Sequence, residues 1–297
     1  MVHPDEGSDQ DTSPARHSPR ATSIRILVVG AGTPNADYVA KVLSEHGVSA
    51  DWTTKLRYPN PLNLRRYNIV YGIYLQSCSR YILAAKMLRK KTIVHFVGSD
   101  AYWYSREHSI WRRIYWRLVL HNTDLILYVS PHLEQMVRRS GRVLPFPIRT
   151  DGFKESELRE IQPERDLIYY CPSGAANEKV YQLSWIVKYA HEHPDEKITI
   201  LGNESHPANY KIQLPNVEVL PFVPQSEMPQ LYRNHKRLIR MTTEDGLPRM
   251  IHEAFLAGLE VIFNGNHITH IPLEREPEEF SRAFLAAIGS LDPTPKK

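Results

Sequence analysis

Residues 242–265 read TTEDGLPRMIHEAFLAGLEVIFNG and set the fold class of the whole chain. An acidic turn runs into Pro248, a residue type that suits the start of a helix, and an apolar segment follows to about Ala257. Gly258 is typical of a helix end, and residues 261–263 have the apolar character of a buried strand. The stretch therefore predicts a loop, a helix and a strand in an α/β domain.

The junction of this loop and helix is a potential anion site. The first turn of a helix has unpaired N–H groups and the positive end of the helix dipole, which both favour a phosphate. Asp245 lies just before that turn and Glu253 lies inside the helix, so two carboxylates flank the site. This arrangement suits a sugar nucleotide. Two structural alternatives stay open: Arg249 and Glu253 could form an ordinary surface ion pair, and Asp245-Gly246 could be only a turn.

The same stretch resembles the signature of retaining GT-B glycosyltransferases, specifically glycosyltransferase family 4 with its glycosyl transferases group 1 domain. Two acids separated by seven residues, Asp245 and Glu253, enclose Gly246-Leu247-Pro248, and residues 253–258 match the family's helix. Asp245 stands where the family usually has Glu. The resemblance implies a GT-B fold, in which two Rossmann-like domains with parallel sheets face each other across a cleft. It also implies a hexosyltransferase-like activity that needs no metal and no cofactor besides the nucleotide-sugar substrate.

Length and composition fit a protein with two globular domains. The chain has 297 residues, and no apolar run approaches the ~20 residues that cross a bilayer. Cys78 and Cys171 fall in different predicted domains, give no disulfide framework or metal spacing, and suit a reducing cytosol. Residues 1–150 contain 21 Lys and Arg against 11 Asp and Glu, whereas residues 151–297 contain 16 against 22. The basic half could therefore face anionic lipid, nucleic acid or an anionic acceptor.

The N-terminal half alternates strands with helices. Residues 1–22 are predicted to be a disordered tail, and residues 23–150 an acceptor-side Rossmann-like domain. Its strands are predicted at 24–29, 48–52, 68–75, 92–97 and 125–129, and its helices at 35–45, 79–88 and 109–120. The resemblance places the loop that contains Gly32 near the donor phosphates. A tight turn without a ligand remains the alternative.

Residues 95–100 follow the fourth of these strands and read HFVGSD. They resemble the family's His-x-x-Gly-Ser-Asp segment, which implies that His95 or Asp100 faces the reaction centre and positions the reacting groups. An imidazole can exchange protons near neutral pH, and a carboxylate can accept from a sugar hydroxyl. The structural alternative is a strand-buried histidine with an aspartate in a helix cap or turn.

The segment 102–122 is unusually rich in aromatic residues and arginine. At helical spacing Arg113 and Arg117 share one face, whereas Trp111, Ile114 and Leu118 share another with Tyr115. Such a helix suits the headgroup region of a membrane, and a core-packed helix with a solvated arginine face is the alternative. Basic and aromatic residues also suit nucleic acid, but no nucleic-acid-binding motif accompanies them, so no nucleic-acid partner is expected.

Residues 151–297 are predicted to form a nucleotide-sugar-binding domain, whose last helix, 276–288, can pack back on the first domain. Strands are predicted at 166–171, 197–201, 217–220, 237–241 and 261–263, and helices at 180–190 and 226–232. By the resemblance, Lys179 binds the diphosphate and the backbone at Phe222 and Val223 meets the base. Ser173 or Gly174 stands where the family has a diphosphate-binding arginine, so either another arginine supplies the charge or catalysis is weakened.

These features indicate a cytoplasmic retaining glycosyltransferase, peripheral to the inner face of a membrane. It would move a sugar from a nucleotide-diphosphate donor to a glycan or lipid-linked acceptor in glycan biosynthesis. By the resemblance, Glu253 holds the donor ribose, Asp245 the sugar hydroxyls, and Pro248 follows the amides at Gly246 and Leu247 that face the diphosphate. The alternative is a non-catalytic GT-B protein that binds a nucleotide or a partner transferase.

Overall fold

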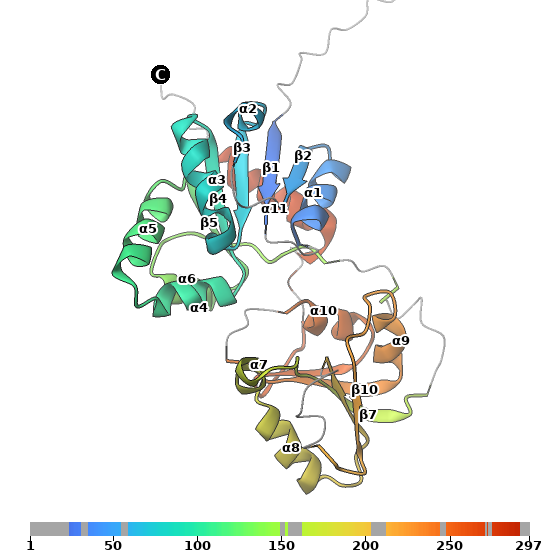
Figure 1. The fold of residues 1–297 in the computed structure, drawn as a ribbon. Coiled ribbons are helices and arrows are strands. Elements are labelled where there is room, and N and C mark those ends of the chain that lie inside the picture. Colours follow the sequence, from blue (N-terminus) through green and yellow to red (C-terminus); the bar gives the residue numbers. More distant parts are fainter. Residues whose placement is uncertain are drawn as a thin grey trace, which may run out of the picture.

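The computed structural model describes residues 24–30, 35–54, 59–148, 152–153, 162–202, 212–243, 248–270, 272 and 275–291. It contains two six-stranded sheets, and Figure 1 shows them in two domains, one above the other. The prediction of two α/β domains with parallel sheets is thereby confirmed. The predicted tail, residues 1–22, and the predicted boundary at Thr150 lie outside the described residues.

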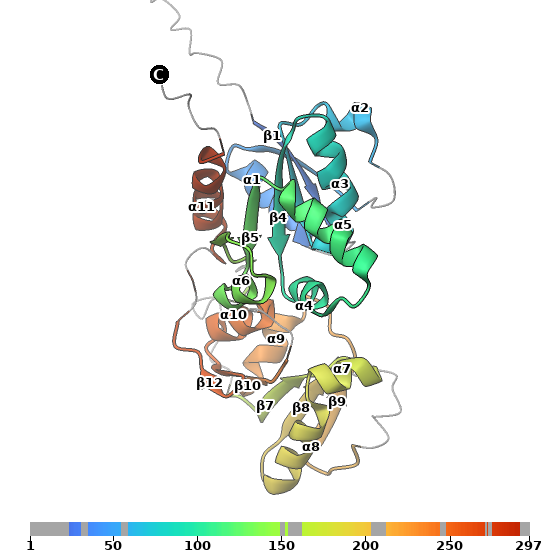
Figure 2. The ribbon, with the colours of Figure 1, turned by 90° about the vertical axis from the view of Figure 1, so that its left-hand side faces the viewer.

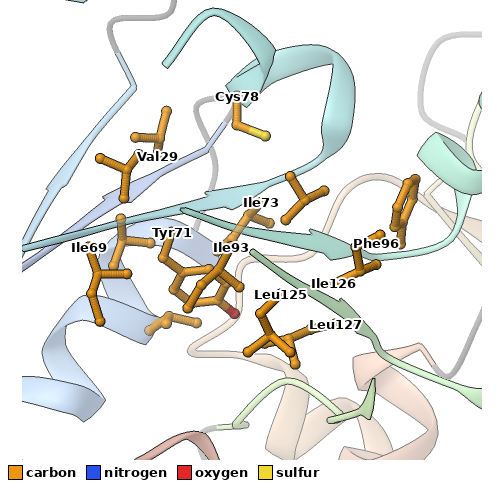
Figure 3. Packing of buried hydrophobic residues seen from close by; sticks show 14 of the residues in the cluster. Val29, Ile69, Tyr71, Ile73, Cys78, Ile93, Phe96, Leu125, Ile126 and Leu127 are labelled. Carbon is orange, nitrogen blue, oxygen red and sulfur yellow. The ribbon is translucent and has the colours of Figure 1, made fainter. Parts of the chain in front are cut away.

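The first sheet is parallel throughout and has the order β2-β1-β3-β4-β5-β6. Its strands are β1 (Arg25–Val29), β2 (Ser49–Thr53), β3 (Ile69–Ile73), β4 (Lys91–Phe96), β5 (Leu125–Tyr128) and β6 (Arg142–Val143). The four central strands are apolar and almost entirely buried, as expected for parallel strands covered on both faces. Figure 3 shows their side chains packed together, with Tyr71 and Phe96 among the largest.

Six helices accompany this sheet: α1 (Asn35–Glu45), α2 (Pro61–Leu64), α3 (Leu75–Met87), α4 (Ser99–Arg106), α5 (Ile110–His121) and α6 (Pro131–Val137). The strand predicted at 68–75 is too long, because Tyr74 has a positive φ of 65° that ends it. α3 therefore begins four residues before its predicted start. Helix α4, which follows β4 through Gly98 at φ 150°, was not predicted from the sequence.

The second sheet has the order β12-β11-β10-β7-β8-β9 and is parallel except for β12. Its strands are β7 (Arg165–Tyr170), β8 (Ile198–Leu201), β9 (Val217–Leu220), β10 (His235–Arg240), β11 (Glu260–Phe263) and β12 (Asn266–His267). The helices α7 (Ala175–Val180), α8 (Leu183–Glu192), α9 (Met228–Arg233) and α10 (Arg249–Leu256) accompany it, and α11 (Pro277–Gly289) follows β12 in the chain. The single helix predicted at 180–190 was wrong, because left-handed Gln182 separates α7 from α8.

The final helix, α11, belongs to the core of the first domain. Phe280 and Phe284 are fully buried in that core, and the Phe284 ring centroid lies 5.0 Å from that of Tyr71. Lys91 Nζ donates to the carbonyl of Leu291 at 2.7 Å, just beyond the helix. Figures 1 and 2 show α11 beside α1, far from the second sheet. The chain thus crosses between the domains twice.

Each sheet has a point at which consecutive strands diverge in opposite directions. In the second sheet this switch point lies between β7 and β10, with β8 and β9 on one side and β11 on the other. Ligands of open α/β sheets bind beside such a point, outside the carboxyl ends of the strands. Tyr170 ends β7 and Arg240 ends β10, and the register pairs the preceding residues, Tyr169 and Ile239. The topology therefore places Tyr170 and Arg240 where a ligand is expected.

Candidate nucleotide-sugar site

A cavity of about 340 Å³ lies at this switch point. Its walls come from the ends of β7, β8 and β10, the segment after β9 and the start of α10. The lining residues are Tyr170, Tyr181, Leu201, Gly202, Phe222, Val223, Gln225, Met228, Arg240, Pro248, Arg249, Met250 and Glu253. Hollows of about 580 and 700 Å³ in the first domain are larger. The position at the strand ends nevertheless makes the smaller cavity the candidate ligand site.

Arg240 is a buried cation in the wall of this cavity. Its guanidinium carbon lies 4.6 Å from the ring centroid of Tyr170 and 4.8 Å from that of Tyr181. Stacking on two aromatic faces stabilises the charge and holds the planar group in one orientation. Nη1 of the guanidinium also lies 3.3 Å from the sulfur of Met250. The result is a preorganised cation beside the start of α10, suited to a phosphate group.

Glu253 is the buried acid of the same cavity, with a side chain only 2% exposed. Its Oε1 accepts from Gln225 Nε2 at 2.8 Å and lies 3.1 Å from Nε of Arg249, while Oε2 accepts from the Tyr232 hydroxyl at 3.3 Å. Burial raises the pKa of Glu253, against the opposing effects of the Arg249 charge and of these hydrogen bonds. The predicted Arg249–Glu253 pair therefore forms, but its acid lies in a ligand-sized cavity rather than on the surface.

The start of α10 forms one wall of the cavity. Pro248 precedes the helix, and Arg249, 42% exposed in its side chain, bridges from Glu253 to Gln225 Oε1 at 2.8 Å. Two cationic side chains, Arg240 and Arg249, thus accompany the positive end of the helix dipole. Such a wall suits a diphosphate.

The structure brings four of the predicted donor-binding residues together: Phe222, Val223, Pro248 and Glu253. Phe222 is 71% exposed, so its ring is available to a ligand. Lys179 is exposed near the end of α7 and does not line the cavity. The other predicted donor-binding residues, Gly32, Gly246 and Leu247, lie outside the described residues, as does Asp245, a predicted catalytic residue.

Sequence reasoning missed Arg240, Tyr170 and Tyr181. The signal available was the position of Arg240 at the end of a predicted strand, since the carboxyl ends of parallel strands carry the ligand-binding residues. What the sequence lacked was the strand order, because only the pairing of β7 with β10 places Arg240 beside Tyr170.

Arg275 connects the site to the crossing between the domains. Its Nη1 donates to the carbonyl of Pro248 at 3.4 Å, and its own carbonyl accepts from the N–H of Ile148 at 2.9 Å. Burial lowers the pKa of this guanidinium to about 9, which the charge of Glu253 partly opposes. Burial of the His252 side chain, together with the nearby charge of Arg275, lowers the pKa of His252 to about 3. The start of α10 is therefore tied to the segment that enters from the first domain.

His95 and Asp100 lie in the first domain, and neither side chain is accessible. Asp100 Oδ1 accepts from the N–H groups of Val97 and Gly98 at 2.9 and 3.1 Å, and Oδ2 accepts from that of Leu75 at 3.1 Å. Burial raises the pKa of Asp100, and these hydrogen bonds oppose the shift. The carboxylate thus joins the start of α3 to the turn after β4, which is the structural alternative given by the sequence.

His95 is packed between aromatic rings in the same region. Its Nδ1 and the hydroxyl of Tyr71 share a hydrogen bond of 2.6 Å, and its ring centroid lies 4.4 Å from that of Phe146. Burial lowers the pKa of His95 to about 3, so the ring is neutral at physiological pH. His95 is therefore a core histidine that lies against Phe146, in the segment that leads from the first domain to the second.

This burial predicts a pH-dependent stability. Between about pH 6 and pH 4 the unfolded state binds a proton on His95 that the folded state does not. For this residue the free energy of unfolding therefore falls by about 1.4 kcal/mol for each unit by which the pH is lowered. Urea titrations should therefore show a shallower pH dependence for His95→Gln than for the wild type. Tyr71→Phe removes the hydrogen bond but retains the titrating ring, so its slope should stay. Equal slopes for His95→Gln and the wild type would contradict the buried neutral histidine.

Within the described ranges, no group of three or more His, Cys, Asp and Glu side chains is arranged to hold a metal ion. None of the helices in that part of the chain has both the length and the apolar content for a membrane crossing.

Comparison with known proteins relates the chain to others by fold. No protein-family model matches it, and no curated protein matches its sequence. Among solved structures, sucrose-phosphate synthase from Thermosynechococcus elongatus is similar at 12% identity and a TM-score of 0.61, over 90% of each chain. HepE of Anabaena in complex with UDP and glucose is similar at 13% identity and a TM-score of 0.57, over 89% of this chain and 90% of that one.

A third similar structure is an alpha-glucosyltransferase in complex with UDP and a 13-mer DNA. It has 12% identity and a TM-score of 0.54, over 91% of this chain and 90% of the other. At these identities the likeness establishes the arrangement of the chain, and it extends across both domains. The chain therefore has the two-domain GT-B fold that these glycosyltransferases share.

Proposed function

We propose that this protein is a retaining glycosyltransferase that uses a nucleotide-diphosphate sugar. The observation that carries the proposal is the cavity at the β7–β10 switch point, which combines the cation Arg240 with the buried acid Glu253. Two further observations support it: the fold is shared with an alpha-glucosyltransferase, and residues 242–265 resemble the family 4 signature. UDP is the first nucleotide to test, because two of the three neighbours named above, HepE and the alpha-glucosyltransferase, were solved with it.

Each wall of the cavity has a separate task in this reaction. Glu253 accepts hydrogen bonds from the ribose hydroxyls, and Phe222 with Val223 meets the base. Arg240, Arg249 and the start of α10 neutralise the diphosphate as the bond from the anomeric carbon to its oxygen breaks. Lys179 and the segment that contains Asp245, Gly246 and Leu247 complete the donor site in this proposal. Retention of configuration rests on the resemblance alone.

The acceptor belongs to the first domain in this proposal. We place a glycan or lipid-linked acceptor there because that half of the chain is basic, and we place the protein in the cytoplasm at the inner face of a membrane. By the resemblance, Gly32 contributes to donor binding from the first domain. His95 and Asp100 act by holding the ends of β3 and β4 in position rather than by touching the substrate.

The proposal is tested by nucleoside diphosphate release from UDP-, GDP- and ADP-sugars. We expect release from one of them, by slow hydrolysis where no acceptor is present. Glu253→Gln should lower kcat/KM by about 100-fold, because a buried hydrogen bond to a charged group is worth about 1.5–3 kcal/mol. Release should persist in EDTA, since arginines supply the positive charge.

Glu278→Gln on the exposed side of α11 is the matched control and should retain full activity. Nucleotide binding without release from any donor, with or without extracts that contain acceptors, would favour the non-catalytic alternative. Absence of nucleotide binding would contradict the donor site itself.

A further inference from the structure

A second hollow, of about 580 Å³, lies in the first domain and is lined by four arginines. Arg113 and Arg117 come from α5, and Arg138 and Arg139 follow the end of α6. The other lining residues are Tyr104, Ser105, Met136 and Val137, so no acidic side chain of the described chain lines the hollow. Figure 1 shows α4 and α6, which border it, at the end of the domain that faces the second domain.

The charge of this hollow is not neutralised within the described part of the chain. There, none of the four arginines forms an ion pair with an acidic residue, whereas neighbouring Arg112 pairs with Glu107. The dipole at the end of α6 amounts to at most about half a charge, far less than four guanidinium groups. Arg138 also has a left-handed backbone, with φ 57°, at a position where glycine is preferred. Four arginines that line one hollow without an acidic residue among its lining suit a multivalent anion.

The exposed residues of α5 and α4 indicate the source of that anion. On α5, Ile110, Ile114 and Leu118 form the row next to Arg113 and Arg117, and Trp111 lies beside that row. All four of these apolar residues are exposed, Trp111 by 78%, and Trp103 on α4 is exposed by 65%. The core-facing side of α5 is instead formed by Trp116, Val119 and Leu120. The helix therefore packs on the core, but through a different face from the one that Trp111, Ile114 and Leu118 share.

We propose that the four-arginine hollow binds the phosphate of an anionic lipid headgroup while the apolar row of α5 enters the acyl boundary. A helix with arginine in one row and Trp, Ile and Leu in the next suits the interface of a membrane. A soluble anion needs the arginines but gains nothing from the exposed tryptophans. The proposal rests on the membrane placement in the proposed function and names the residues that would make the contact. The site lies in the other domain from the donor cavity, so its test does not depend on turnover.

The test is co-sedimentation with phosphatidylglycerol vesicles, with phosphatidylcholine vesicles as the uncharged comparison. We expect binding to phosphatidylglycerol alone, weakened about 30-fold in R113A/R117A. R65A/R66A removes the same charge from exposed residues after α2, which Figure 1 shows at the opposite end of the domain, and should change binding far less. All of these residues are exposed, so both variants should fold, and thermal unfolding verifies it.

A second pair of measurements distinguishes the lipid from a soluble phosphate. W111S/I114S should lose vesicle binding but keep the affinity for pyrophosphate, measured by calorimetry with saturating UDP in the donor cavity, because its arginines remain. Pyrophosphate binding that persists under UDP and is lost in R113A/R117A, in a wild-type protein that does not sediment with phosphatidylglycerol, would overturn the lipid source. An equal loss in R65A/R66A and R113A/R117A would overturn the site, since net charge alone would then account for binding.

Discussion

Arg240→Ala is expected to weaken UDP binding by about 10- to 100-fold, because a hydrogen bond from a charged donor is worth about 1.5–3 kcal/mol. The effect should be large because the guanidinium is buried against Tyr170 and Tyr181 and reaches the cavity without reorganisation. Arg240→Lys keeps the charge but loses the planar guanidinium and its stacking, so its affinity for UDP should lie between those of the wild type and of Arg240→Ala. Calorimetric titration of UDP measures all three proteins.

Two controls make this prediction specific. Arg282→Ala removes an arginine from an exposed ion pair on α11 and should leave UDP affinity unchanged. Thermal unfolding of Arg240→Ala shows whether the fold survives the loss of a buried side chain. A folded Arg240→Ala protein with the UDP affinity of the wild type would show that the diphosphate is bound by other groups.

Phe284→Ala is expected to lower the free energy of unfolding by about 3–5 kcal/mol, the usual cost of truncating a buried phenylalanine. Its ring contacts Tyr71 and Phe280 in the core of the first domain, although α11 follows the second domain in the chain. Loss of this anchor should release the last helix as well as leave a cavity. Urea titration followed by tryptophan fluorescence gives the measurement.

The neighbouring residue on the same helix is the matched control. Leu285 is 36% exposed, so Leu285→Ala should cost less than about 1 kcal/mol. Equal costs for Phe284→Ala and Leu285→Ala would contradict the docking of α11 into the first domain.

The fold could be predicted from the sequence because its central strands are short, continuous apolar runs. Residues 26–29, 69–73, 93–96 and 125–128 are buried on both faces, and only a covered parallel sheet explains such a pattern between helices. The boundaries that failed depend on single backbone conformations. Tyr74 and Gln182 both adopt a positive φ that their side chains do not signal.

The candidate site could be predicted only in part. Glu253 and Pro248 carry a local pattern, so their helix could be identified and its start proposed as an anion site. Arg240 and Tyr170 are 70 residues apart in the sequence, and only the strand order brings them together. Their joint role is therefore a tertiary property, and no local pattern reports it.

The exposed row on α5 was ambiguous for a different reason. Periodicity shows that Trp111, Ile114 and Leu118 share a face, but it does not say whether that face meets the core or the solvent. The helix has a second apolar face, at Trp116, Val119 and Leu120, and the structure assigns the core to that one. A helix with two apolar faces thus needs its packing partner to be known.

The most direct test of the account is a crystal structure of the protein with UDP. The account predicts the nucleotide in the cavity at the ends of β7 and β10, with the diphosphate against Arg240 and the start of α10 and the ribose at Glu253. A nucleotide bound anywhere else, for example with its diphosphate in the four-arginine hollow of the first domain, would contradict the assignment of the donor site.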